Sequence, residues 1–492
     1  MGARAGLILC LAVVAITLFR LFALTQSATN LAVDEAQYWS WAQTPSWGYY
    51  SKPPMVAWLI GLAQMVCGSG EACVRAPSAL AWAVTAIGIA AAAWTLYGRE
   101  VGLWAGLAAL LAPGAAFSAR LISTDAPLLA FWSLALLAFV QLRAGRSARW
   151  GILLAVALGL GLLSKYAMLY FLGGAVVAVL VDPASRSAFR RTPVWGGLLA
   201  GLTFLVPNLA WQARHGLATL RHTADNATGG GATPGVADGL EFVAAQFMLA
   251  GPVVFAFACA AAWAMARGRL VRPEDRMLVA FAAPILVVLT VVAFITRAHG
   301  NWGATALIAV FILGSAFAVR QGRQGWLAGG LAFGLLTQTA LPLLDANALR
   351  LSFRGEAVFD RVLGWDVFGE TVKRRAADAR AVLVVAETRR DAAALLYYGR
   401  DQSVPVAVWP ADGPPQDHFQ MDRPLTAAGA ARGLVLAVSS CAPPGGFSDW
   451  RRVVDLGEVR VETGPGATRR WRLYLLVGPP AVIRRPPPCP SG

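Results

Sequence analysis

The chain has 492 residues, of which 57% are hydrophobic and only 14% are charged, and its mean hydropathy is +0.56. These values exclude a soluble globular protein and indicate a polytopic membrane protein. The formal net charge of +15 does not imply a nucleic acid partner, because basic loops on one side of a membrane account for much of it.

Apolar segments recur along the first 345 residues. The run from Gly6 to Leu24 could be a signal peptide, but no small-residue cleavage site precedes Asp34, so we interpret it as a retained first span. A window of about 20 residues, which crosses roughly 30 Å of hydrocarbon, predicts about eleven transmembrane helices. They cover residues 6–24, 76–97, 101–119, 124–142, 150–164, 167–181, 194–212, 242–265, 277–296, 303–319 and 325–343. The shorter apolar segment Pro53–Cys67 is predicted to lie in the membrane interface.

Basic residues divide the loops into two alternating sets. The first set comprises Arg4, Arg99, Arg143, Arg146, Arg149, Arg186, Arg190, Arg191, Arg267, Arg269, Arg272, Arg276, Arg320 and Arg323. The second comprises only Lys52, Arg75, Arg120, Lys165, Arg214, Arg221 and Arg297. Because cytoplasmic loops are enriched in Lys and Arg, the first set is predicted to be cytoplasmic.

The function-capable side chains belong to the opposite side. They are Asp34, Glu35, Lys52, Asp125, Lys165, His215, His299, Asn301 and Trp302. A protein that only anchors another to the membrane would not need polar and ionisable residues concentrated on one side. An active site that opens to the periplasm or cell exterior would need them there. We therefore expect a multi-pass protein of the inner (cell) membrane with its site on the extracytoplasmic face.

From about Asp345 the composition becomes that of a soluble domain. We expect a membrane domain at residues 1–345 and an extracytoplasmic α/β domain at 346–492. Strands are predicted at Ala381–Ala386, Val404–Trp409, Gly433–Val438, Arg452–Val461 and Trp471–Val477, with a helix at Asp391–Tyr398. About 20 basic against 16 acidic residues in this part of the chain imply no strong electrostatic partner.

Four of the six cysteines fall on the predicted outer side. The pairs Cys67/Cys73 and Cys441/Cys489 could form disulfides in an oxidising compartment or remain free thiols. Cys10 and Cys259 lie within spans, where we expect small buried apolar residues.

The first outer loop carries Asp34-Glu35, followed by Tyr38 and Trp39. Acids at a helix start are favoured by capping and by the helix dipole, so a structural role is one interpretation. Paired carboxylates beside aromatic rings in so apolar a protein fit a reaction site better, because intramembrane charges are costly.

Two lysines and a third acid follow. Lys52, before Pro53-Pro54, and Lys165-Tyr166 could snorkel to the interface or bind an anionic headgroup such as a lipid phosphate. Asp125 could cap its helix or pair with Asp34 as an acid couple.

A further polar cluster runs from Arg297 through His299 to Asn301-Trp302. It could bind phosphate and stack a sugar, or form a turn with an interfacial Trp. Asn208 and Gln212 add polar groups to the same outer side.

Five of these motifs, in this order, carry a family resemblance. They are Asp34-Glu35-x-x-Tyr38-Trp39, Trp47-Gly48-Tyr49 through Lys52-Pro53-Pro54, Ser123-Thr124-Asp125-Ala126-Pro127, Gly161 to Tyr166, and Asn301-Trp302. The chain resembles the bacterial family 39 glycosyltransferases, which are similar to protein O-mannosyltransferases and to aminoarabinose and galacturonic acid transferases that modify lipopolysaccharide. Many bacterial relatives carry His where this chain has Lys52.

The resemblance implies a GT-C fold and inverting transfer of a hexose or pentose from a polyprenyl-phosphate-linked donor to lipid A, a glycan or an exported protein. It makes Asp34 the general base, Glu35 a supporting residue, and Asp125 an acceptor-orienting residue, with a divalent metal on these three acids as an option. Donor phosphate contacts would come from Lys52, Lys165, Tyr166, Arg297 and His299. Contacts to acceptor or sugar would come from Tyr38, Trp39, Tyr49, Asn301 and Trp302.

Two other classes of function compete with this hypothesis. A transporter or flippase for a lipid-linked or anionic substrate would also place charges in a membrane, but internal repeats and charged broken helices are not visible in the sequence. A non-enzymatic scaffold would tolerate Asp34→Asn.

Overall fold

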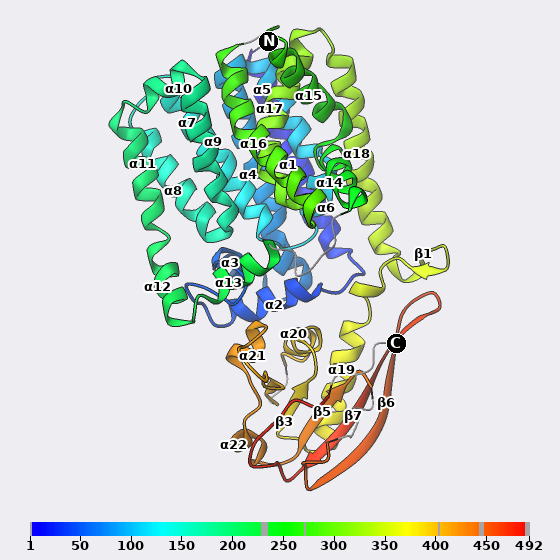
Figure 1. The fold of residues 1–492 in the computed structure, drawn as a ribbon. Coiled ribbons are helices and arrows are strands. Elements are labelled where there is room, and N and C mark those ends of the chain that lie inside the picture. The colour runs from blue at the N-terminus through cyan, green and yellow to red at the C-terminus, as the bar shows by residue number, and fades with distance from the viewer. Residues whose placement is uncertain (1, 228–234, 270–271, 402–403, 442–446, 488–492) are drawn as a thin grey trace. The chain divides into compact units, whose positions relative to one another are not determined.

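The computed structural model describes residues 2–227, 235–269, 272–401, 404–441 and 447–487. The chain divides into two compact units, each described separately below (Figure 1). The membrane unit comprises Met1–Thr25 and Ser46–Pro342, and the sheet unit comprises Gln26–Pro45 and Leu343–Gly492.

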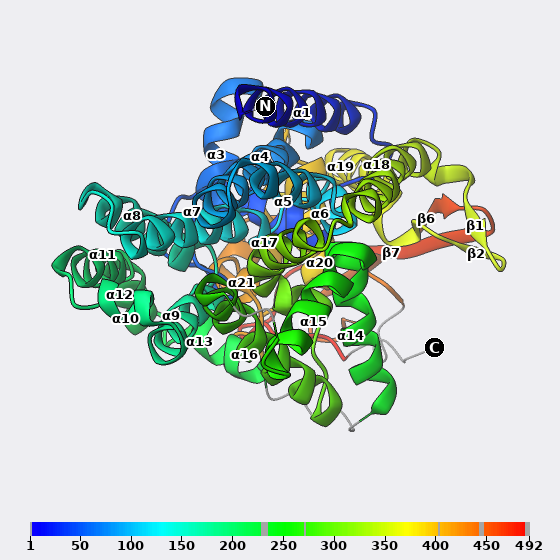
Figure 2. The same ribbon diagram turned by 90° about the horizontal axis from the view of Figure 1, so that it is seen from above.

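All secondary structure in the described part of the membrane unit is helical. Its helices are α1 (Gly2–Thr25), α3 (Met55–Cys67), α4 (Glu71–Tyr97), α5 (Arg99–Leu111), α6 (Pro113–Ser118), α7 (Asp125–Arg143), α8 (Arg149–Ser164), η1 (Tyr166–Leu169), α9 (Tyr170–Val181), α10 (Pro183–Ala188), α11 (Thr192–Thr203), α12 (Val206–Arg214), α13 (Ala218–Ala227), α14 (Val236–Ala250), α15 (Pro252–Ala266), α16 (Pro273–Ile295), η3 (Gly300–Gly303), α17 (Ala304–Arg320) and α18 (Gln324–Ala346). Seen from above, α4 lies beside α5 and α7, and α8 beside α11 (Figure 2).

Fewer helices than the eleven predicted are long enough to span a bilayer. Among the described residues seven helices qualify by length and apolar composition, or eight if the pair α14 and α15, bent by 111°, is one span. The segment 101–119 is interrupted at Pro113, which lacks the N–H that would continue α5. The segments 150–164 and 167–181 are separated by Lys165 in an extended conformation and stay short.

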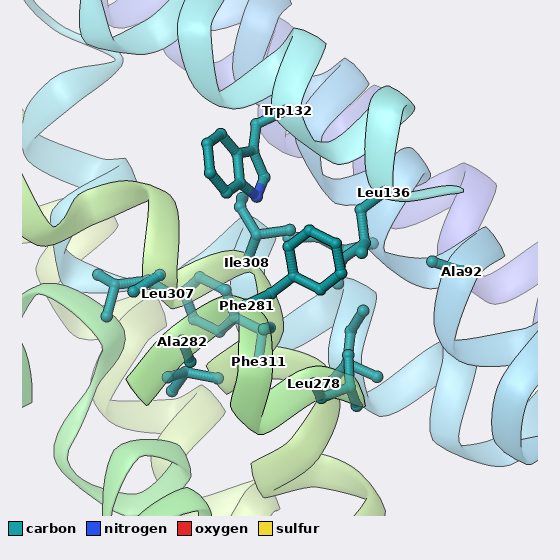
Figure 3. Close-up of a cluster of buried hydrophobic side chains, with 14 of the residues drawn as sticks. Ala92, Trp132, Leu136, Leu278, Phe281, Ala282, Leu307, Ile308 and Phe311 are labelled. Carbon is teal, nitrogen blue, oxygen red and sulfur yellow. The ribbon is translucent and has the colours of Figure 1, made fainter. Parts of the chain in front are cut away.

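Aromatic side chains from four helices fill the core of the membrane unit. Trp132 of α7, Phe281 of α16 and Phe311 of α17 lie close to one another (Figure 3) and are fully buried. Phe171 of α9 contacts Trp132 and Phe281 with ring centroids 5.3 and 5.0 Å apart. Each such pair stabilises the fold by about 1 kcal/mol beyond the effect of burying its area. This packing is important in a membrane, because lipid is as apolar as the helix surfaces and the hydrophobic effect does not drive helices together there.

Some basic residues of the predicted cytoplasmic set have acidic partners. Arg143 donates two hydrogen bonds to Asp182, at 2.7 and 3.0 Å. Arg320 donates to Asp275 at 2.9 Å, and Tyr97 donates to the same carboxylate at 2.7 Å. These ion pairs join the ends of different helices. The arginines therefore stabilise helix packing, in addition to any role in setting the orientation of the protein in the membrane.

The sheet unit contains a five-stranded mixed sheet in the order β4-β3-β5-β7-β6. Its elements are α2 (Val33–Ala42), η4 (Ala348–Arg350), β1 (Ser352–Phe353), β2 (Glu356–Ala357), η5 (Asp360–Val362), α19 (Trp365–Asp378), β3 (Leu383–Ala386), α20 (Arg389–Tyr398), β4 (Val406–Val408), α21 (His418–Asp422), α22 (Ala427–Ala430), β5 (Val435–Ser439), β6 (Arg452–Gly464) and β7 (Ala467–Val477). Strand β3 is parallel to β4 and β5, whereas β7 is antiparallel to β5 and β6. All five predicted strands and the helix after β3 are confirmed.

The segment 26–45 belongs to the sheet unit, although it precedes most of the membrane helices in sequence. The N–H of Leu31 donates to the Tyr398 hydroxyl at 2.7 Å, and the N–H of Trp365 donates to Asn30 Oδ1 at 2.8 Å. Trp39 of α2 contacts Tyr397 of α20 edge to face at 5.0 Å. Helix α2 is thereby anchored to residues more than 300 positions later in the chain.

The cysteines follow the sequence prediction in part. Cys67 and Cys73 form a disulfide with Cα atoms 5.8 Å apart. Cys441 is also disulfide-bonded, whereas Cys489 lies outside the described residues. Cys10 and Cys259 are free thiols on the exposed surface of their helices, so the prediction of burial was wrong; a cysteine in a spanning helix can face lipid instead.

Candidate active site

An ion pair in the membrane unit unites three predicted site residues. Lys165 donates to Asp125 Oδ1 at 2.7 Å, and Asn301 donates through Nδ2 to Asp125 Oδ2 at 2.8 Å. The Lys165 and Asp125 side chains are only 21% and 14% exposed. Asp125 begins α7 and Lys165 directly follows the last residue of α8, so the two helix ends converge on one carboxylate.

A pocket of about 160 Å³ opens beside this pair. Its walls include Lys52, Lys165, Tyr166, Tyr170 and Trp302. The pocket therefore combines two cationic side chains with aromatic rings, which suits an anionic group attached to an apolar or sugar moiety. This arrangement brings together four of the predicted donor and sugar contacts.

Helix capping was one interpretation of Asp125, and the hydrogen bonds at the start of α7 give it little support. Thr124 occupies the N-cap position of α7 but makes no side-chain capping hydrogen bond. The Asp125 N–H donates instead to the Ser123 hydroxyl at 3.3 Å. The Asp125 carboxylate instead accepts hydrogen bonds from Lys165 and Asn301.

A buried polar network holds the wall of this pocket. The Tyr166 hydroxyl donates to Asn208 Oδ1 at 2.7 Å and accepts from Gln212 Nε2 at 3.3 Å. Asn208 Nδ2 donates to the Trp47 carbonyl at 2.7 Å, and the Thr219 hydroxyl donates to the Tyr49 carbonyl at 2.6 Å. Asn208, Gln212 and Thr219 are fully buried. The network ties the loop that carries Lys52 to α12 and α13.

The same loop packs closely on α12. A Cβ atom on Gly48 would lie 2.6 Å from the Trp211 ring and 3.0 Å from Asn208 Nδ2, so only glycine fits there. Tyr49 is 1% exposed, and its hydroxyl accepts from the Ser46 N–H at 3.1 Å. Burial raises the pKa of Tyr49 to about 12. Tyr49 thus supports the loop from within, and its predicted contact to sugar stays a prediction.

Arg297 and His299 lie on the exposed surface of the membrane unit. The His299 ring contacts Trp302 edge to face at 5.7 Å, which links this segment to the pocket through Trp302. A direct phosphate contact from either residue stays a prediction.

In the sheet unit, Asp34 is an exposed carboxylate with an arginine partner. Arg389, the first residue of α20, donates through Nη1 to Asp34 Oδ1 at 2.9 Å and to Gln37 Oε1 at 2.8 Å. The side chain of Asp34 is 60% exposed, so this pairing leaves it accessible to solvent. The pairing of Asp34 with Asp125 stays a prediction.

The neighbouring side chains of α2 are buried. Glu35 is 2% exposed and accepts from the Ala32 N–H at 2.9 Å, which caps the start of α2. Tyr38 and Trp39 are 4% and 6% exposed and pack within the sheet unit. Packing accounts for these aromatic residues, and their predicted role in binding sugar stays a prediction.

Metal ligation was an option for the three acids. Among the described residues, no group of three or more His, Cys, Asp or Glu side chains is arranged to hold a metal ion.

Sequence reasoning missed Arg389, Gln37, Thr219, Tyr170 and Thr223, of which the last three line the pocket of the membrane unit. One signal could have found Arg389. It follows a buried parallel strand and opens a helix, and ligand-binding residues often occupy this place in α/β folds.

Comparison with solved structures defines the class of protein. The crystal structure of ArnT from Cupriavidus metallidurans in the apo state matches with a TM-score of 0.61 at 17% identity, covering 96% of this chain and 98% of that one. The structure of the same protein bound to undecaprenyl phosphate matches with a TM-score of 0.63 at 15% identity, covering 94% and 97%. The expected architecture is confirmed: the chain is a multi-pass integral membrane protein with the GT-C fold and a small C-terminal sheet domain.

Sequence comparison identifies the family. Residues 51–211 match the family described as dolichyl-phosphate-mannose-protein mannosyltransferase. The chain is 32% identical to the lipid A galacturonosyltransferase RgtD of Rhizobium johnstonii over 429 residues, 87% of this chain and 89% of that protein. The chain belongs to glycosyltransferase family 39 and is a membrane glycosyltransferase, so the transporter hypothesis is not retained.

Proposed function

We propose that the protein transfers a sugar from a polyprenyl-phosphate-linked donor to lipid A on the periplasmic side of the inner membrane. The pocket beside Lys52 and Lys165 carries this proposal, since two lysines at one site suit a phosphate monoester that leaves with negative charge. RgtD is named for galacturonic acid transfer to lipid A, so galacturonic acid is the first sugar to test.

The chemistry asks for one base and a stabilised leaving group. In the proposed mechanism Asp34 accepts the proton of the acceptor hydroxyl as the oxygen attacks the anomeric carbon from the face opposite the phosphate. The bond between that carbon and the phosphate oxygen breaks, and the configuration inverts. Lys52 and Lys165 offset the charge that grows on the leaving phosphate.

Asp125 has a positioning role in this proposal. Because it accepts from both Lys165 and Asn301, it holds the ammonium group at the pocket wall. Tyr166 contributes its ring to the wall, since its hydroxyl is already engaged by Asn208 and Gln212.

The test is a transfer assay with purified protein in lipid nanodiscs. Undecaprenyl phosphate carrying galacturonic acid, glucose or aminoarabinose is supplied with lipid A; the products are identified by mass spectrometry, and their anomeric configuration is read by NMR. One donor should yield a glycosylated lipid A with inverted anomeric configuration. Consumption of no donor, or transfer with retention, would contradict the proposal.

A further inference from the structure

A second pocket, of about 560 Å³, lies wholly within the sheet unit. Its lining includes four arginines, Arg389, Arg390, Arg469 and Arg470, together with Trp365 and Trp471; we refer to it as the arginine pocket. The arginines come from the start of α20 and from β7. Its volume is within the range of ligand sites in proteins.

Arg469 is held in place by aromatic and backbone groups. Its guanidinium lies 4.1 Å from the centre of the Trp365 ring and donates to the carbonyls of Leu363 and Asp360 at 3.3 and 2.6 Å. The ring and the two carbonyls carry no net charge, and the carboxylates of Asp360 and Asp391 offset the charge of Arg469 only in part. A guanidinium fixed in this way loses little freedom when it binds an anion.

Arg390 supplies a second charge without compensation. Among the described residues Arg390 has no hydrogen bond or ion pair, and it is exposed. Burial lowers the pKa of Arg469 and repulsion from Arg390 lowers it further, whereas attraction from Asp360 and Asp391 opposes the shift without reversing it; the two arginines also line the same pocket. An anion placed there would relieve this repulsion.

One acid, Asp391, lines the pocket itself, and both it and the nearby Glu387 already accept hydrogen bonds. Asp391 is 4% exposed, accepts from Trp471 Nε1 at 2.9 Å and from Thr388 at 2.5 Å, and has a pKa raised by burial. Glu387 accepts from the hydroxyls of Ser439 and Ser440 at 3.0 and 2.9 Å. Glu458 lies 3.6 Å from Arg470 and partly offsets that arginine. Arg390 and Arg469 therefore keep a local positive charge.

The fourth arginine connects the pocket to the proposed base. Arg389 lines the pocket and donates to Asp34 at 2.9 Å. An anion bound between the arginines would hold the molecule that carries it next to the Asp34 carboxylate. We propose that the arginine pocket binds a phosphate or carboxylate group of the saccharide acceptor and delivers a neighbouring hydroxyl to Asp34; this inference rests on the proposed function.

Binding without donor tests the inference independently of catalysis. Three radiolabelled acceptors are titrated against full-length protein in nanodiscs: phosphorylated lipid A, lipid A stripped of phosphate, and stripped lipid A bearing an acidic sugar. The proteins are wild type, Arg390→Gln, Arg390→Lys and the matched control Arg374→Gln, whose arginine is exposed on α19 away from the pocket lining. Thermal melts check that each variant is folded.

We expect Arg390→Gln to weaken binding of an anionic acceptor about tenfold, as for a lost charge-assisted hydrogen bond, and to leave the neutral acceptor unchanged. Arg390→Lys should recover part of the loss, and Arg374→Gln should match wild type. A loss confined to phosphorylated lipid A assigns phosphate, and a loss confined to the acidic sugar assigns carboxylate. Equal binding of all three acceptors by wild type, or an unchanged profile in Arg390→Gln, overturns the inference.

Transfer assays with the same proteins separate this inference from the proposed function. If the function and the pocket are both as described, Arg390→Gln raises KM for the anionic acceptor and leaves kcat near wild type. Transfer with unchanged KM contradicts the pocket alone. Charge-dependent binding without any sugar transfer by wild type contradicts the function alone.

Discussion

At the scale of single residues, Asp125 shows how one carboxylate organises the pocket. Replacing Asp125 with Asn removes the charge that attracts Lys165 and leaves one oxygen where two now accept hydrogen bonds. A misplaced catalytic group commonly costs about 10²-fold. We expect kcat/KM of Asp125→Asn to fall by about 10- to 100-fold with the melting temperature near wild type.

Asp378→Asn is the matched control, because Asp378 is an exposed acid at the end of α19. It should retain wild-type turnover. Full activity in Asp125→Asn would remove Asp125 from the mechanism.

His418 makes the stability of the sheet unit depend on pH. Burial lowers its pKa to about 4, with Arg423 adding to the shift and Asp422 opposing it; its ring contacts Trp41 at 5.3 Å. Below the ordinary pKa of about 6.5 the unfolded chain binds a proton that the folded chain rejects. Stability should therefore fall between about pH 6.5 and pH 4, by about 3 kcal/mol in total.

The measurement is the apparent melting temperature of wild type and His418→Gln from pH 7 to pH 4.5. The wild type should lose more stability than the variant on acidification, because Gln does not titrate. Parallel curves would show that another group causes the acid sensitivity.

At the scale of elements, the network around Asn208 fixes the loop 46–54 against α12. Asn208→Ala leaves the Tyr166 hydroxyl and the Trp47 carbonyl without this buried partner, at a cost of about 1–3 kcal/mol. We expect a lower melting temperature and a raised KM for the lipid-linked donor, because Lys52 and Tyr166 are then less well placed. A raised KM is specific to loop positioning, and a variant that loses stability but binds donor normally would contradict the role.

The elements that could be predicted from sequence are those with strong local patterns. The strands of the sheet unit have continuous apolar runs such as Val384–Ala386, and such runs predict buried strands directly from the sequence. Span length was less predictable, because a break at Pro113 or Lys165 leaves mean hydropathy nearly unchanged. Lipid exposure of Cys10 and Cys259 depends on helix packing, which an all-apolar segment does not encode in its periodicity.

Long-range partners could not be predicted for a related reason. The bond from Arg389 to Asp34 joins residues 355 positions apart, and no local pattern in either segment names the other. The sequence identifies Asp125, Lys165 and Asn301 as candidates one by one. That Lys165 and Asn301 both donate to the Asp125 carboxylate follows from the positions of α7, α8 and η3 in space. Their chemistry could be read from sequence, whereas their geometry required the fold.

At the scale of the whole molecule, the predicted orientation can be tested by labelling. Single cysteines are introduced at Ser147, in the loop after α7, and at Gly413, after β4, both exposed, in a background without Cys10 and Cys259. In intact cells with a permeable outer membrane, an impermeant maleimide should label Gly413→Cys but not Ser147→Cys. The reverse pattern would invert the topology.

The central claim is that this membrane glycosyltransferase modifies lipid A with Asp34 as the base. Mass spectrometry of lipid A from cells lacking the gene, complemented with wild type or Asp34→Asn, tests it most directly. We expect one sugar increment to be lost in the mutant strain and restored by wild type but not by Asp34→Asn expressed at the same level. Restoration by Asp34→Asn, or lipid A of unchanged mass in the mutant strain, would contradict the account.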